Sequence, residues 1–168
     1  MKAWKKISIT IAIVLFGFML FLVWYKNHFK MGIAKTYVVN TKYKHKTLLI
    51  ATQGSKFKDK VVKEIVDHFK EKKVYIKVID VTKLPSIDEE DWDAIAILHV
   101  WEIWKPQPDA EKFINQVKDP SRLVVFVTSG DGIYKMENVD AITGASILSE
   151  ASSKALQIEK RINAILNL

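Results

Sequence analysis

An uninterrupted apolar run near the N-terminus places the strongest constraint on this chain. Residues 7–25 read ISITIAIVLFGFMLFLVWY, and these 19 positions contain no charged residue. At 1.5 Å per residue, a helix of that length is about 28 Å long, which matches the hydrocarbon core of a bilayer. Trp4, Trp24 and Tyr25 flank the run, and such aromatic residues favour the membrane interface. We therefore expect one transmembrane helix over residues 7–25, after a short basic tail of residues 1–6.

The side of the membrane on which the rest of the chain lies stays open at this point. A cleaved signal peptide is the alternative to an anchor, but its apolar region is usually only about 7 to 15 residues long. Lysines flank the run on both sides, namely Lys2, Lys5 and Lys6 before it and Lys26, Lys30, Lys35, Lys42 and Lys44 after it. The larger number after the run favours the cytoplasm. A basic start before an apolar run is instead typical of exported anchors.

Charge divides the chain into two parts. Residues 1–46 carry nine Lys and no acidic residue, whereas residues 47–168 carry 17 basic and 19 acidic residues. We expect residues 26–46 to form a basic stem, either a solvated linker or a contact for anionic lipid headgroups. The remainder lacks the basic face of a nucleic-acid-binding protein. Since the chain has no Cys, disulfides and thiolate metal sites are excluded.

Residues 47–168 predict one α/β domain. Four apolar, β-rich runs cover residues 47–51, 74–81, 92–100 and 123–128. Three of these runs are nearly continuous in aliphatic residues, as in strands that are covered on both faces. Helical stripes lie over residues 56–70, after Pro108, and from Leu148 to the end of the chain. The alternation predicts a doubly wound, open parallel sheet of four to five strands, with ligand loops at the carboxyl ends of the strands.

Three loops at those ends contain the candidate binding residues. The first is a small Gly-containing turn that opens a helix, the second contains two Trp, and the third is a Gly-Asp turn that ends in Tyr. The candidates are Thr52, Gln53, Gly54, Ser55 and Lys56 in the first loop, Trp101 and Trp104 in the second, and Ser129, Gly130, Asp131 and Tyr134 in the third.

With these loops, residues 47–168 resemble the flavodoxin-like family. Gly130-Asp131-Gly132-Ile133-Tyr134 fits the Gly-Asp-x-x-Tyr pattern with which that family brings a Tyr to a flavin ring. The resemblance implies flavin mononucleotide (FMN) as cofactor, with its phosphate in the first loop. It also implies that Tyr134 and one of Trp101 and Trp104 cover the two faces of the isoalloxazine ring.

Two segments depart from the family pattern. The family's phosphate loop reads Ser/Thr-x-Thr-Gly-x-Ser/Thr, whereas residues 51–56 read ATQGSK, which keeps the Gly without a hydroxyl at the three pattern positions. The charge of Lys56 and the amides at the helix start are left to hold a phosphate. In addition, only about ten residues separate the fourth run from residues 139–142. The crossover is therefore too short for a helix, and a fifth strand is expected to be short.

A second resemblance covers residues 140–146. The sequence Asp140-Ala141-Ile142-Thr143-Gly144-Ala145-Ser146 is similar to the Asp-x-x-Ser/Thr-Gly-Ala-Ser/Thr acceptor motif of flavin transferases. That resemblance implies an FMN attached through a phosphoester to Ser146, which we expect if the domain lies outside the cytoplasm. The alternative is a strand-to-helix turn in which Ser146 or Ser149 caps the last helix.

The other polar clusters favour structural roles. The acidic residues 88–91 resemble a metal-binding run, but Ser86 and Glu89 have capping-box spacing, and a solvated acidic face is preferred. None of His28, His45, His68 and His99 has metal-ligand spacing, so no metal site is predicted. No hydrolase elbow, Walker loop or His-Glu-x-x-His motif is present, and the sequence leaves open whether the chain is an enzyme.

Two functions are consistent with these features. The first is a membrane-anchored, flavodoxin-like protein that binds FMN and transfers electrons to an unidentified redox partner at the membrane. The second is a flavodoxin-like interaction module without cofactor, which is held at the membrane and binds a protein through an exposed patch at residues 101–108.

Overall fold

The computed structural model describes residues 2–29, 31–43, 45–102 and 104–168. Lys30, Lys44 and Ile103 lie outside the described residues, as do the side chains of Lys2, Lys26 and His28. The chain forms two compact units, Met1–Met31 and Gly32–Leu168, which are described separately below.

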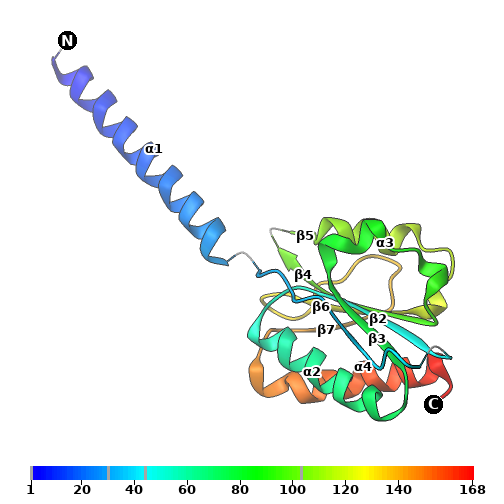
Figure 1. Ribbon diagram of the computed structural model, residues 1–168. Coiled ribbons are helices and arrows are strands. Elements are labelled where there is room, and N and C mark those ends of the chain that lie inside the picture. Colours follow the sequence, from blue (N-terminus) through cyan, green and yellow to red (C-terminus); the bar gives the residue numbers. More distant parts are fainter. Residues whose placement is uncertain (1, 30, 44, 103) are drawn as a thin grey trace. The chain divides into compact units, whose positions relative to one another are not determined.

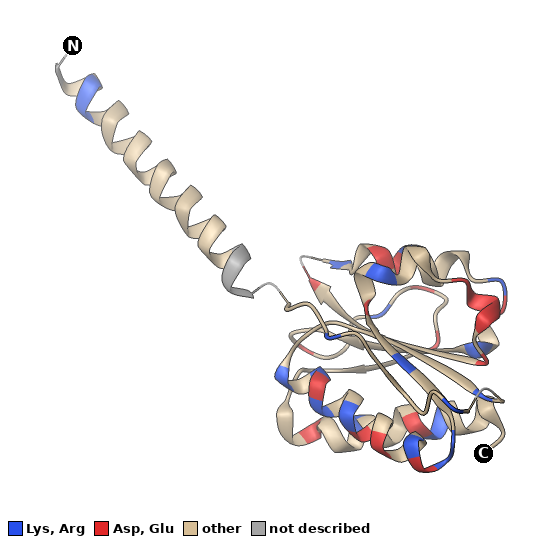
Figure 2. Ribbon diagram, in the orientation of Figure 1, with Lys and Arg blue, Asp and Glu red and all other residues tan. Residues whose placement is uncertain are grey.

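The first unit is helix α1 (Lys2–Phe29). Its stretch Ala3–Tyr25 is long and apolar enough to cross a membrane, and none of that stretch is buried by protein. The charge colouring in Figure 2 shows an uncharged ribbon along the middle of this helix. The predicted apolar helix is therefore present.

The second unit contains a mixed sheet whose central part is parallel. The strands are β1 (Tyr37–Val39), β2 (Thr47–Thr52), β3 (Tyr75–Asp80), β4 (Ala94–Glu102), β5 (Lys105–Pro106), β6 (Leu123–Thr128) and β7 (Ala141–Gly144). Their order is β1-β3-β2-β4-β6-β7, with β5 paired to the end of β4. The five strands β2, β3, β4, β6 and β7 pair in parallel, and their order is the flavodoxin-like order 2-1-3-4-5. The predicted fold class is confirmed.

Helices cover both faces of this sheet (Figure 1). On one face, α2 (Lys56–Glu71) and α4 (Ala151–Leu166) pack on alternate strand residues such as Leu48, Ala96 and Phe126. On the other face, α3 (Pro108–Gln116) and the 3₁₀ segment η1 (Val81–Ser86) pack on Leu49, Ile97 and Val125. Both faces of the central strands are therefore buried, and this explains why these strands are aliphatic at nearly every position.

Two of the crossovers contain no α-helix. The chain from β3 to β4 passes through η1 and the 3₁₀ segment η2 (Glu89–Asp91). Two further 3₁₀ segments, η3 (Pro120–Arg122) and η4 (Leu148–Glu150), precede β6 and α4. Residues 129–140, which connect β6 to β7, form bends and turns. The expectations of a crossover without a helix and of a short fifth strand are confirmed, since β7 has four residues.

The compact unit begins earlier than the expected domain start at residue 47. Gly32 forms an antiparallel bridge with Gly54, and the backbone N–H of Ala34 donates to Asp80 Oδ2 at 2.7 Å. Strand β1 then pairs antiparallel with the outer edge of β3. Most of the expected stem, from Gly32 onward, is thus part of the compact unit, because an edge strand such as β3 leaves backbone groups that another strand can satisfy.

Candidate functional site

The first loop follows β2 and is held by its own hydrogen bonds. Gln53 crosses to the next strand, where its Oε1 accepts from the backbone N–H of Val100 at 2.9 Å. Ser55 is the N-cap of α2, and its Oγ accepts from the N–H of Lys58 at 3.1 Å. Thr52 is buried at the strand end, whereas the Lys56 side chain is exposed. The Ser55 hydroxyl therefore stabilises the start of α2, and the Thr52 side chain is buried at the end of β2.

The arrangement at Gly54 does not fit a phosphate. Its N–H donates to the carbonyl of Gly32 at 2.7 Å, and its carbonyl accepts from the N–H of Gly32 at 2.9 Å. A Cβ added at Gly54 would lie 3.0 Å from Gly32 C and from Ile33 O, so the two backbones are in close contact. An anion at the Gly54 amide would have to displace Gly32, which already bonds that amide.

The predicted aromatic residues meet at the carboxyl ends of β4 and β6. The rings of Trp101 and Tyr134 are parallel within 9°, with centroids 5.8 Å apart, and Trp104 meets Tyr134 edge-on at 6.1 Å. Such distances are those of rings in direct contact. The two expected walls of a flavin site thus lie against each other, and no third ring fits between Trp101 and Tyr134 in this arrangement.

A tight hairpin presents Trp104. Strand β5 returns antiparallel along the end of β4, pairing Glu102 with Lys105, so the turn has only two residues. Trp104 has a left-handed φ of 63° in this turn and remains 78% exposed. A positive φ is uncommon for a residue other than Gly, so the turn holds the Trp104 backbone in an unusual conformation with its ring in solvent.

The third loop folds back on the end of β7. Ser129 Oγ donates to Asp131 Oδ1 at 2.8 Å and accepts from the N–H of Gly132 at 2.9 Å. This hydrogen bond from Ser129 lowers the pKa of the Asp131 carboxyl. Gly132 has a φ of 76°, and a Cβ there would lie 2.5 Å from the backbone N of Ala145. Only Gly permits this approach, which brings the third loop beside residues 144–146.

The acceptor-like segment consists of a buried strand and an exposed end. Thr143 accepts a hydrogen bond from Lys154 Nζ at 2.7 Å through its carbonyl, and Asp140 pairs with Arg161 at 3.1 Å. Ser146 is exposed, and it forms no side-chain hydrogen bond with the described residues. The capping alternative is wrong, because the N-cap of α4 is Glu150, without a side-chain cap bond.

Below the loops lies a buried polar group, in which the burial of His99 agrees with the structural role expected for it and the burial of Lys58 was not expected. Lys58 on α2 is completely buried, and burial lowers its pKa to about 8. His99 on β4 is also completely buried, and burial lowers its pKa to about 4. Burial raises the pKa of Glu102, while the charge of Lys58 lowers it. Lys58 lies four residues before Val62 and eight before Val66, so it shares their face of the helix. This spacing was the signal in the sequence for the burial of Lys58.

Two polar atoms in this region are buried without a partner among the described residues. They are His99 Nε2 and Trp101 Nε1, and both belong to the carboxyl end of β4. His99 Nδ1 lies 3.1 Å from the carbonyl of Val100, which is consistent with a proton on Nδ1 and a free lone pair on Nε2. Buried polar groups are rarely left unpaired except at functional sites or beside ordered water.

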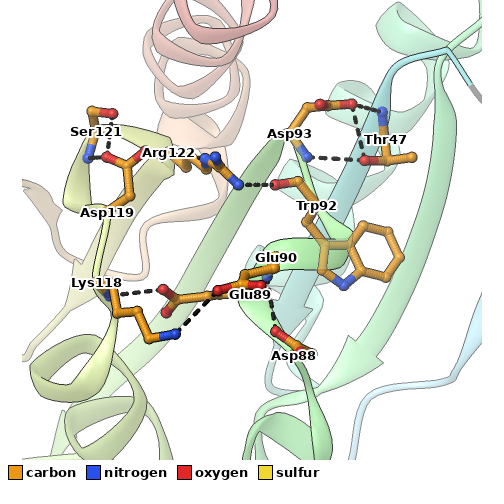
Figure 3. A network of polar contacts seen from close by, with 10 residues as sticks. All are labelled: Thr47, Asp88, Glu89, Glu90, Trp92, Asp93, Lys118, Asp119, Ser121 and Arg122. Atoms are coloured by element: carbon orange, nitrogen blue, oxygen red, sulfur yellow. Dashed lines mark hydrogen bonds and ion pairs between the residues drawn. The ribbon is translucent and has the colours of Figure 1, made fainter.

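The acidic run lies at the opposite, amino-terminal edge of the sheet (Figure 3). Asp88 caps η2 by accepting from the N–H of Glu90, while Glu89 and Glu90 accept from Lys118. Ser86 instead donates to the carbonyl of Lys83, so the predicted capping box is wrong. Among the described residues, no group of three His, Asp or Glu could hold a metal ion.

Comparison with known proteins adds no identity beyond the fold. No protein-family model and no curated protein sequence matches the chain. An archaeal flavodoxin is a structural neighbour, with a TM-score of 0.48, 12% sequence identity, and coverage of 71% of this chain and 98% of its own. A variant of a flavodiiron protein from Thermotoga maritima gives a TM-score of 0.46 and 16% identity over 74% of this chain, which spans 35% of that protein. The strand order itself identifies the fold as flavodoxin-like.

Proposed function

We propose that this protein is a membrane-tethered electron carrier whose FMN is attached through a phosphoester to Ser146. The observation that carries the proposal is the exposed hydroxyl of Ser146, which forms no side-chain hydrogen bond with the described residues and follows β7 at the same end of the sheet as the aromatic residues. The flavodoxin-like fold supports FMN as the cofactor class, and the apolar helix α1 supports the tether.

The closed first loop favours a covalent link over ordinary phosphate binding. With the Gly54 amide bonded to Gly32, the loop offers only Lys56 and the amides at the start of α2. A phosphoester at Ser146 would hold the cofactor without that loop. It would also prevent loss of the flavin if the domain lies outside the cytoplasm, where a weakly bound flavin would diffuse away.

The residues around Ser146 divide into structural and free ones. A Cβ at Gly144 would lie 2.8 Å from Cε of Lys154, whose flexible side chain can move, and the backbone N of Ala145 lies against Gly132. Neither contact requires a hydroxyl at Ser146, which leaves that side chain available for modification.

The attachment is a group transfer by a separate transferase. Ser146 Oγ would form a bond to the FMN phosphorus as its proton leaves, while the bond from that phosphorus to the donor's leaving group breaks. Bound FMN would supply one- and two-electron chemistry. The outer faces of Tyr134 and Trp104 offer stacking surfaces for the tethered ring.

The test is the intact mass of the full chain purified from its native host. We expect the wild type and Ser149→Ala, a neighbouring exposed serine, to carry the mass of one FMN less water. Ser146→Ala should have the unmodified mass. An unmodified wild type, in a domain shown by protease accessibility to be external, would refute the covalent assignment.

One observation favours the second candidate, an interaction module without cofactor. The rings of Trp101 and Tyr134 already stack on each other, and Trp104 remains 78% exposed. A purified protein of unmodified mass that stays colourless after incubation with FMN would support this function. Flavin absorbance that survives denaturation and desalting would exclude it.

A further inference from the structure

We propose that the carboxyl edge of the sheet docks onto the lipid surface of the membrane that anchors the chain. The contact would be an apolar rim of five exposed residues, Ile33, Trp104, Ile133, Ile147 and Leu148. Their exposed fractions are 82%, 78%, 71%, 48% and 51% in that order. A cluster of large, exposed apolar side chains marks a site of contact with a protein or a membrane.

The loops that carry the apolar rim contact one another along one end of the sheet. Ile33 follows Gly32, which is bridged to Gly54 after β2, and Gln53 in turn bonds to the end of β4. Trp104 follows β4, and its ring contacts that of Tyr134, the neighbour of Ile133 after β6. The close approach of Gly132 to Ala145 then brings in Ile147 and Leu148 after β7. Every member therefore lies at the carboxyl ends of parallel strands.

The short connection between the apolar run and the compact unit favours lipid as the molecule that contacts the apolar rim. The last residue of the apolar run, Tyr25, is separated from Gly32 by seven Cα steps, which reach at most about 25 Å when fully extended. Gly32 is fixed to the carboxyl edge by its bridge to Gly54. If residues 7–25 cross the bilayer, Gly32 cannot move farther than this from the interface, which keeps the carboxyl edge near the membrane. Trp and large aliphatic residues at such a position are suited to an interface between headgroups and acyl chains.

The charges on the same loops are balanced, so the apolar residues carry the proposal. Exposed lysines near the rim are Lys35, Lys56, Lys83, Lys105 and Lys135, and exposed acidic residues are Asp59, Glu102, Asp131, Glu137 and Glu150. Since these five positive and five negative groups offset one another, docking should not require anionic lipid and should resist high salt. The proposal also does not depend on flavin at Ser146.

The absence of Cys from the chain permits a clean experiment. The full chain with Ile133→Cys is labelled with a nitroxide and reconstituted into vesicles of zwitterionic phosphatidylcholine. Collisions with oxygen, which dissolves in lipid, are compared with collisions with an aqueous nickel chelate. Leu156→Cys is the matched control, because Leu156 is 65% exposed but lies on α4.

We expect a ratio of oxygen to nickel collisions several-fold higher at residue 133 than at residue 156. Adding Trp104→Ser to the Ile133→Cys chain should return the label toward the aqueous ratio. Aqueous ratios at both sites would overturn the proposal and favour a protein partner for the rim. Spin–spin broadening that disappears when labelled chains are diluted with unlabelled ones would overturn it in favour of a second copy of this chain.

Discussion

The contact between Gly32 and Gly54 can be tested by a substitution that adds one methyl group at Gly54. Gly54→Ala places a Cβ 3.0 Å from Gly32 C and Ile33 O and 3.1 Å from Gly32 O, all of which are backbone atoms. The segment must move away and lose the two backbone hydrogen bonds at 2.7 and 2.9 Å. At about 0.5–1.5 kcal/mol for each hydrogen bond, the expected loss of unfolding free energy is about 1–3 kcal/mol. For a domain of this size, that corresponds to a Tm lower by about 3–10 °C.

Gly130→Ala is the matched control. A Cβ at Gly130 would meet nothing within 4 Å, and the gain from a stiffer unfolded chain is common to both variants. The assay is urea unfolding of both variants, combined with hydrogen exchange at the backbone amides of residues 32 and 34. We expect faster exchange in Gly54→Ala alone. Equal stability and equal exchange in the two variants would show that the N-terminal segment is not held at the first loop.

Two further predictions concern the domain boundary and acid stability. Deleting residues 1–30 should move the protein to the soluble fraction with its fold intact. Deleting residues 1–46 should lower the unfolding free energy, because Asp80 loses the Ala34 amide and β3 loses β1; equal urea midpoints would contradict this. The folded pKa of His99, about 4, lies below the ordinary 6.5, so the unfolded state binds more protons between these pH values. The wild type should lose about 3 kcal/mol as pH falls through this window, and His99→Gln should lack this loss; parallel pH profiles would refute it.

The sequence predicted the layers of the fold well because periodicity reports burial directly. Residues 123–128 were read as a strand to the residue, and the helix predicted over residues 56–70 extends only to Glu71. Strands covered on both faces have an aliphatic composition that few other structures share. The absence of a helix between β6 and β7 followed from the small number of residues between them, because a helical crossover needs a longer segment.

The site was less predictable because it depends on contacts between distant segments. Tyr134 and Trp101 were expected in one place, but their mutual stacking follows from loop geometry that no local pattern encodes. Gly32 reads as a linker residue, and only the bridge shows that it closes the first loop. The burial of Lys58 was visible in helical phase, yet a charged residue is ordinarily assigned to the solvent side.

The position of α4 in the sequence has a consequence for biosynthesis. The helix follows every strand along the chain, yet Ile158 and Ile162 help to cover the same face of the sheet as α2. During translation, all five parallel strands can be complete while part of that face is still open to solvent. Such an intermediate exposes apolar surface and must be shielded, for example by chaperones, until the last helix emerges. Premature termination before residue 151 would therefore yield an aggregation-prone fragment and not a smaller folded domain.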